Sequence, residues 1–201
     1  MRQISFGEKS SALLEKILLP LRVRQIVKNN RSIDKIKAVA DIGTGYRATF
    51  LFQLIEKYPN IELAVGVDLS VEKKLENEKI KLVVADLNKN LPIEDCLFDA
   101  VFSTAVIEHL DNYTLALKEM HRILKPGGSI FITTPSPRAK PILEFLAFRL
   151  SLLDKLEIGD HKNYFSGKGL KVILQETGFD NVRVKSFQFG LNNIATGKKS
   201  T

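Results

Sequence analysis

Residues 39–49 read VADIGTGYRAT, and this stretch decides the fold class. A short apolar run that ends at Gly43 and Gly45 is typical of a buried strand that turns sharply into a helix. Together with Ala48, the glycines fit the G-x-G-x-x-[GA] spacing of dinucleotide-binding loops. The stretch also reads D-x-G-x-G, because Asp41 precedes the glycines. The loop is therefore predicted to hold either a dinucleotide or a nucleoside cofactor without phosphate.

Asp41 begins to separate these two ligands. A pyrophosphate binds to amide N–H groups at the positive end of a helix, so an anion beneath the loop matches it poorly. A buried carboxylate needs polar partners. We expect the N–H groups of the loop, or the cationic end of an amino-acid-like ligand, to supply them. Asp41 thus favours a ligand that carries an α-amino group.

Strand-like and helix-like patterns alternate from residue 37 to the C-terminus. This order predicts an α/β protein with a mostly parallel sheet and helices on both faces. A further helix over 10–29, interrupted by Pro20, precedes it. We expect Ser166 to cap one helix and Gly178 to end it. The predicted strands are 37–42, 61–68, 80–86, 98–103, 129–134, 181–189 and 192–199, and the later helices are 49–58, 113–124, 140–156 and 167–177.

Polar residues gather at the carboxyl ends of these strands, where ligands of such sheets bind. Asp68 can accept both hydroxyls of a ribose, or it is a turn or helix-capping residue. Asp86 can accept from the exocyclic amine of a purine with Leu87 against the ring, or it forms an Asx-turn. The positions that share a strand end are Asp41, Asp68, Asp86 and Ser103–Thr104.

Composition sets the broad class. The 201 residues are 44% apolar and 26% charged, as in a globular protein, and no apolar run reaches the length of a membrane span. The N-terminus lacks a signal-peptide pattern, so we expect a cytoplasmic protein. Cys96 is the one cysteine, which excludes a disulfide framework, and we expect no metal site. The net charge of +7 fits a solvated surface, or contact with nucleic acid, anionic lipid or an acidic substrate.

Several segments together resemble the class I S-adenosylmethionine-dependent methyltransferases, closest to the branch with quinone and small-molecule enzymes. The most specific are FDAVFSTAVIEHLDN (98–112) and LKPGG (124–128), which accompany VADIGTG (39–45) and AVGVDLS (64–70). The resemblance implies a Rossmann-like, doubly wound, seven-stranded and mostly parallel sheet with an antiparallel C-terminal strand. It also implies one domain over 1–201, divided into an N-terminal helical segment (1–35), a cofactor-binding core (36–135), a substrate-covering segment (136–165) and a C-terminal helix and strand pair (166–201).

The resemblance also implies S-adenosyl-L-methionine as cofactor and S-adenosyl-L-homocysteine as product. Glu108 and His109 would open the helix after the fourth strand, near the mouth of the site. The family has a third small residue where this chain has Arg47, which must point outward or alter the loop. The implied cofactor contacts are Asp41, Gly43 and Gly45 at the methionine moiety, Asp68 at the ribose, Leu69, Asp86 and Leu87 at the adenine, and Thr104 on the substrate side.

Methyl transfer from a sulfonium mainly requires alignment and exclusion of water. A general base is needed only for a nucleophile that is protonated at neutral pH. His109, Glu108 and His161 are the candidates. Alternatively, Glu108 and His109 cap a helix and line the pocket, and His161 orients a lid. His121 is expected to be structural.

The helix pattern at 141–156 is apolar nearly all around. It indicates a buried covering helix, a lid over an apolar or aromatic small molecule, or a peripheral membrane contact. Basic residues near it would suit an anionic surface or an acidic substrate: Arg138, Lys140, Arg149 and Lys155.

Other functions stay open from the sequence. A methyltransferase acting on RNA or protein is compatible with the basic balance, but the chain has no aromatic-rich basic patch, which disfavours nucleic acid as a partner. A non-catalytic domain that binds the cofactor is slightly favoured by Arg47. A dinucleotide-dependent oxidoreductase is the remaining alternative.

Overall fold

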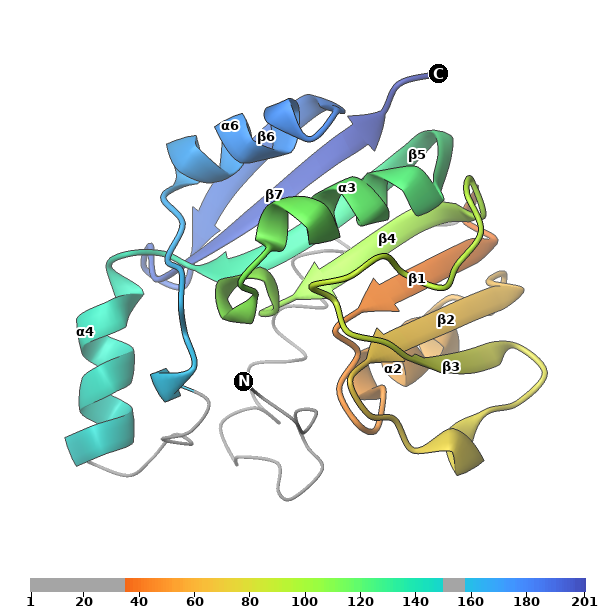
Figure 1. The fold of residues 1–201 in the computed structure, drawn as a ribbon, viewed down its shortest axis with the longest axis horizontal. Helices are drawn as coiled ribbons and strands as arrows, with labels where there is room; N and C mark the ends of the chain where they lie inside the picture. Colours follow the sequence, from red (N-terminus) through yellow and green to blue (C-terminus); the bar gives the residue numbers. More distant parts are fainter. Residues whose placement is uncertain (1–34, 150–157) are drawn as a thin grey trace.

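The computed structural model describes residues 35–149 and 158–201 (Figure 1). The helix predicted over 10–29, and the part of the 140–156 helix after residue 149, lie outside the described residues. The described chain forms a seven-stranded sheet in the order β3-β2-β1-β4-β5-β7-β6. The strands are β1 (Ala38–Ile42), β2 (Leu63–Asp68), β3 (Ile80–Val84), β4 (Phe98–Thr104), β5 (Leu124–Pro135), β6 (Phe179–Phe187) and β7 (Asn192–Lys199).

The pairing of the strands confirms the predicted fold class. All neighbouring pairs from β3 to β5 are parallel, and β7 runs antiparallel to both β5 and β6. The sheet reverses its order beside β1, which pairs with β2 on one side and with β4 on the other. The carboxyl ends of β1, β2 and β4 therefore meet at the switch point, where doubly wound sheets bind ligands.

Helices cover both faces of the sheet. In Figure 1, α3 (Tyr113–Ile123) and α6 (Gly167–Glu176) lie across one face, and α2 (Thr49–Lys57) lies on the other. Each face has its own hydrophobic core, and successive residues of β1 alternate between them: Ala38 and Ala40 belong to the core beneath α3 and α6, Val39 to the core beneath α2. This alternation follows from the period of two in a strand, so both faces of the central strands are apolar.

The helix ends follow the local signals in the sequence. Ser166 accepts a hydrogen bond from the Gly169 amide at 3.1 Å and so caps α6, as predicted. Gly178 follows α6 with a φ of +101°, the left-handed conformation that glycine adopts without strain. Asn112 caps α3 by accepting from the Leu115 amide at 3.1 Å.

The Lys-Pro-Gly-Gly run at 125–128 lies between the helix (113–124) and the strand (129–134) that the sequence predicts, but the structure includes it in β5. β5 begins at Leu124, directly after α3, and Leu124 pairs with Phe98 before a bulge in the ladder. Gly127 has a φ of +76°, and a Cβ on Gly128 would lie 2.8 Å from the Lys125 carbonyl. The two glycines therefore let the chain bend within the strand.

The segment after β5 is exposed where the structure describes it. The short helix α4 (Ala139–Glu144) continues into a π-helix, η4 (Phe145–Arg149), and this arm leaves the sheet at its carboxyl edge (Figure 1). Phe145 is 55% and Phe148 50% exposed. The interpretation as a fully buried covering helix is therefore wrong for residues 139–149. No described helix is long and apolar enough to cross a membrane.

Candidate functional site

The glycine loop after β1 is tied to the end of β2. Gly43 and Gly45 have φ values of +83° and +73°, so both need the conformational freedom of glycine. The amides of Gly43 and Thr44 donate to the Val67 carbonyl at 2.8 and 3.0 Å, and the Gly45 amide donates to Asp68 Oδ2 at 2.7 Å. These bonds fix the loop against the neighbouring strand before any ligand binds.

A side chain from the chain itself covers Gly43. A Cβ placed on Gly43 would lie 2.2 Å from Val106 Cγ2 and 2.7 Å from Val106 Cγ1. Real Cβ atoms do not approach so closely, so Gly43 is required both by the turn and by Val106. The sequence pointed to a close ligand contact at this glycine, and the structure adds a packing requirement that no local pattern contains.

Asp41 is buried in β1 beneath the loop, with 1% of its surface exposed. The loop amides are bonded to Val67 and Asp68, so of the two partners expected for Asp41 the loop N–H groups are excluded, and the cationic end of a ligand is the other. Neither Asp41 oxygen has an aligned hydrogen-bond partner among the described residues. Burial raises the pKa of Asp41 to about 7; the nearby Thr44 hydroxyl offsets part of this rise although it is not aligned as a bond, and Asp68 adds to it.

Arg47 points outward and does not alter the glycine loop. Its side chain is exposed, which is one of the two outcomes that the sequence allowed. The next residue, Ala48, is fully buried and adopts a φ of +47° immediately before α2. Ala48 therefore supplies the small side chain that lets α2 pack against the sheet.

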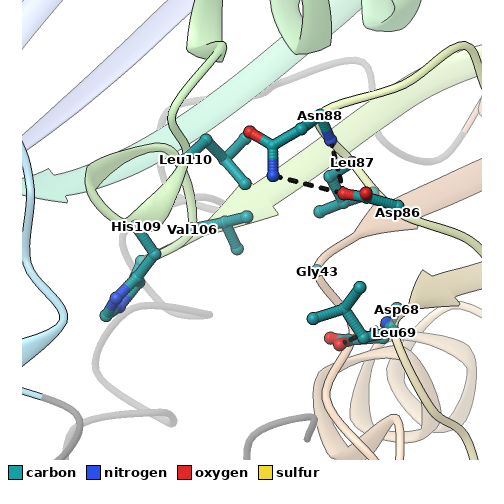
Figure 2. Close-up of a pocket in the computed structure, with 10 residues that line it drawn as sticks. Gly43, Asp68, Leu69, Asp86, Leu87, Asn88, Val106, His109 and Leu110 are labelled. Carbon is teal, nitrogen blue, oxygen red and sulfur yellow. Dashed lines mark hydrogen bonds between the residues drawn. The ribbon is translucent and has the colours of Figure 1, made fainter. Parts of the chain in front are cut away.

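A cleft opens at the carboxyl edge between these strands (Figure 2). Figure 2 shows Asp86, Leu87 and Asn88 on one side of it and Gly43, Asp68 and Leu69 on the other. Six residues predicted for the site line the cleft: Gly43, Asp68, Leu69, Asp86, Leu87 and His109. Four more line it that the sequence did not single out: Asn88, Ala105, Val106 and Leu110.

Other predicted residues lie close by but outside this lining. Asp41 lies in β1 beneath the loop, Gly45 lies in the loop, and Thr104 ends β4 directly before Ala105 of the cleft. Glu108 and His161 form a separate group with His109. The residues predicted at the carboxyl ends of the strands therefore lie at one edge of the sheet, and some of them line the cleft.

Asp68 and Asp86 both make local hydrogen bonds. Asp68 accepts from the Gly45 amide through Oδ2 and from the Leu69 amide through Oδ1, at 2.7 and 2.8 Å. Asp86 Oδ1 accepts from the Asn88 amide at 3.0 Å, which is the Asx-turn that the sequence left open. This bond, with weaker help from other contacts, holds the pKa of Asp86 below its usual value, so the residue stays charged at the cleft.

Asn88 is a site residue that sequence analysis missed. Its side chain donates to Asp86 Oδ1 at 3.2 Å, and its own Oδ1 accepts from the amides of Asp111 and Asn112 at 2.9 and 3.0 Å. It therefore joins the loop after β3 to the turn before α3. The one local signal for Asn88 in the sequence is its position two residues after Asp86, which is where an Asx-turn places the donor amide.

The resemblance implied that Glu108 and His109 begin the helix after the fourth strand, but they do not belong to α3. They form a separate 3₁₀ turn, η3 (Ile107–His109), and α3 begins at Tyr113. Neither caps that helix, since Asn112 does so. Glu108 is fully buried, and its Oε2 accepts from the Thr134 hydroxyl at 3.1 Å.

His161 comes to this turn from a distant part of the chain. The amides of Lys162 and Asn163 donate to the Glu108 carbonyl at 2.8 and 3.0 Å. The rings of His109 and His161 lie edge to face with centroids 4.6 Å apart. The three predicted catalytic candidates are thus brought together. His121 instead packs on Phe179 at 5.0 Å, in agreement with a structural role.

The sequence profile of the methyltransferase-domain family matches residues 16–184. The chain belongs to this family. A demethylmenaquinone methyltransferase of Staphylococcus aureus is 33% identical to it over 148 residues, which cover 66% of this chain and 61% of that protein. This chain therefore spans less than two thirds of the length of that relative.

Solved structures agree on the fold. A SAM-dependent methyltransferase of Thermotoga maritima superposes with a TM-score of 0.67 at 19% identity, covering 94% of this chain and 92% of that one. Human N-acetylserotonin methyltransferase, solved with S-adenosylmethionine, gives 0.66 at 17% identity, covering 94% and 55%. The chain thus has the Rossmann-like fold of class I methyltransferases.

Proposed function

We propose that this protein transfers a methyl group from S-adenosyl-L-methionine to a small apolar or aromatic acceptor. The observation that carries the proposal is Asp41, a fully buried carboxylate under the glycine loop whose oxygens lack an aligned partner among the residues that the structure describes. A cationic α-amino group would satisfy it. A diphosphate would add negative charge beside Asp41 and Asp68, so the residues present fit the methionine end of this cofactor and not a dinucleotide.

The cleft offers separate places for the parts of the cofactor. Asp68 is 2.7 Å from the Gly45 amide at the edge of the loop, and a carboxylate there can accept several hydrogen bonds at once, including those of the ribose hydroxyls. Asp86, fixed by Asn88, would accept from the adenine amine, while Leu69 and Leu87 would pack against its ring. Gly43 and Gly45 would lie beside the methionine moiety, and Thr104 would face the acceptor.

The bound cofactor supplies the reaction with an activated methyl group on its sulfonium. The chain's part is to hold the acceptor in line with that methyl group and to exclude water. Val106 and Leu110 contribute apolar side chains to the lining of the cleft. His109 lines the same cleft and lies 3.3 Å from Asp160 through Nδ1, so it is placed to accept a proton from an acceptor hydroxyl. Glu108, buried behind it, is a positioning residue.

Three observations support the acceptor class. Val106 and Leu110 are apolar lining residues of the cleft. The arm formed by α4 and η4, which leaves the sheet at its carboxyl edge (Figure 1), carries the exposed Phe145 and Phe148. The curated relative is named for a quinone substrate. Support for a non-catalytic domain came from Arg47, and it weakens because Ala48 provides the small buried residue instead.

Thermal unfolding with added ligand tests the cofactor. S-adenosylhomocysteine at 100 times its dissociation constant should stabilise the protein by about 2.7 kcal/mol, and NADH should not. Asp68→Ala should lose this shift, with Asp180→Ala on the far strand β6 as the matched control. A shift with NADH alone would reject the proposal. Transfer of labelled methyl groups to a panel of quinols and phenols would then identify the acceptor.

A further inference from the structure

One candidate ligand from each of Glu108, His109 and His161 lies within 4.8 Å of the other two. The set combines one carboxylate oxygen with two imidazole nitrogens, and it lies beside the cofactor cleft because His109 lines both. The sequence, with its one cysteine, led us to expect no metal site, and these three residues come from two segments that lie far apart in the chain. Their convergence argues the other way.

We propose that Glu108, His109 and His161 bind a divalent transition-metal ion of the zinc class. Two histidines and one carboxylate are the donor set of catalytic zinc sites and leave coordination positions open. Ligands of one zinc ion lie about 3.3 Å apart, as follows from bond lengths of about 2.0–2.2 Å and tetrahedral angles. Side-chain rotations that draw the three atoms together by up to about 1.5 Å would close the site.

The second layer of contacts suits such an ion. Nδ1 of His109 lies 3.3 Å from Asp160 Oδ2, and Nδ1 of His161 lies 3.1 Å from the Tyr164 hydroxyl. Metal-binding histidines commonly hold an oxygen acceptor with one ring nitrogen and bind the ion with the other. The Thr134 hydroxyl orients Glu108 in the same way, at 3.1 Å from Oε2.

The backbone also fixes the two segments against each other. The Glu108 carbonyl receives both the Lys162 and the Asn163 amides, and the Asn163 side chain donates to the Leu110 carbonyl at 3.0 Å. Lys162 Nζ forms an ion pair with Asp111 at 2.7 Å. The donor atoms are therefore held near one another before the ion binds, which lowers the ordering cost of binding.

The role of the ion rests on the proposed methyl transfer and narrows its acceptor to a hydroxyl compound such as a phenol or a quinol. The hydroxyl oxygen would bind an open coordination position and release its proton to solvent, because a divalent cation stabilises the phenolate. A lone pair of this oxygen then forms the bond to the methyl carbon. The carbon–sulfur bond breaks at the same time, and the electron pair of that broken bond remains on sulfur, which becomes a neutral thioether. The ion keeps its charge throughout, and His109 acts as a ligand instead of a base.

Direct metal binding tests the site without any methyl transfer. The full chain, purified without a polyhistidine tag and stripped of metal, is titrated with Co²⁺ followed by visible absorption, and with Zn²⁺ by calorimetry. We expect one equivalent in the wild type, at least about 100-fold weaker binding in His161→Ala, and about 10–100-fold weaker binding in Asp160→Asn. His121→Gln is the matched control, because His121 is the one histidine of the chain outside the proposed site, and its loss should leave metal binding unchanged.

The S-adenosylhomocysteine shift separates the two proposals. It reports that each variant is folded and tests the cofactor site independently of the metal. Glu108 is buried, so Glu108→Gln serves as a second ligand variant only if it keeps this shift. A wild-type chain that shows the shift but takes up no stoichiometric Co²⁺, or a His161→Ala variant that binds as tightly as wild type, would overturn the metal site. Uptake of Co²⁺ without the shift would support the metal site and reject the cofactor.

Discussion

The Asp41→Asn substitution removes one buried charge and keeps the shape of the side chain. In the wild type, burial raises the pKa of Asp41 from 3.8 to about 7, with Asp68 adding to the rise. At any pH between these two pKa values, Asp41 holds a proton in the folded protein that it has lost in the unfolded chain. The free energy of unfolding therefore falls as the pH rises through this window, and the loss is complete above about pH 7.

The magnitude follows from the width of the window. One pKa unit corresponds to 1.36 kcal/mol, so a shift of about three units costs the wild type about 4 kcal/mol at pH 8 relative to pH 4. The amide introduced at position 41 brings donors that also need partners, which reduces the gain. We expect Asp41→Asn to be about 2–4 kcal/mol more stable than wild type at pH 8 and close to it at pH 4.

The same charge should couple the cofactor to pH. A bound α-ammonium group favours the ionised carboxylate, so binding releases the Asp41 proton below about pH 7. The affinity for S-adenosylhomocysteine should then rise about tenfold per pH unit from pH 5 to 7 and level off. Asp41→Asn should bind more weakly at pH 7 and lose this slope, whereas Asp180→Asn on β6 should keep both.

Two measurements check this reasoning. Urea unfolding at pH 4 and pH 8 gives the stability difference between wild type and variant at each pH. Calorimetry with S-adenosylhomocysteine in buffers of different ionisation enthalpy counts the protons released. A wild-type affinity that is flat between pH 5 and 7, or a variant that keeps the slope, would show that Asp41 does not contact the cationic end of the cofactor.

Three further outcomes follow from the described contacts. Gly43→Ala should destabilise the protein by about 2–4 kcal/mol, because the new Cβ would clash with Val106 and the φ of residue 43 is positive. Adding Val106→Ala to this variant should recover at least about 1 kcal/mol of stability. If the two substitutions were strictly additive in a double-mutant cycle, the proposed contact between Gly43 and Val106 would be contradicted. Phe145→Ser with Phe148→Ser should reduce sedimentation with anionic vesicles without changing the S-adenosylhomocysteine shift, and unchanged sedimentation would reject a membrane contact by this arm. Asn88→Ala should weaken S-adenosylhomocysteine binding several-fold by freeing Asp86, and an unchanged affinity would reject that positioning role.

Much of the site's outline could be predicted because its signals are local. The alternation of strands and helices comes from hydrophobic periods of two and 3.6 residues, and the glycines mark the turn after β1. Asp68 and Asp86 could be placed at one edge because parallel strands bring their carboxyl ends together. The ligand preference of the D-x-G-x-G loop could likewise be predicted, because Asp41 and the glycines lie next to each other in the chain.

The tertiary structure decided the partners of these residues. The loop amides bind Val67 and Asp68 on β2 and leave Asp41 without them, and Val106 from the β4 end packs over Gly43. His161 meets Glu108 and His109 only because the chain after α4 returns to the 3₁₀ turn. A single sequence encodes turns and periodicity through near neighbours. Which donor reaches which acceptor across strands depends on the distances that the packed sheet sets, and those distances exist only once the chain has folded.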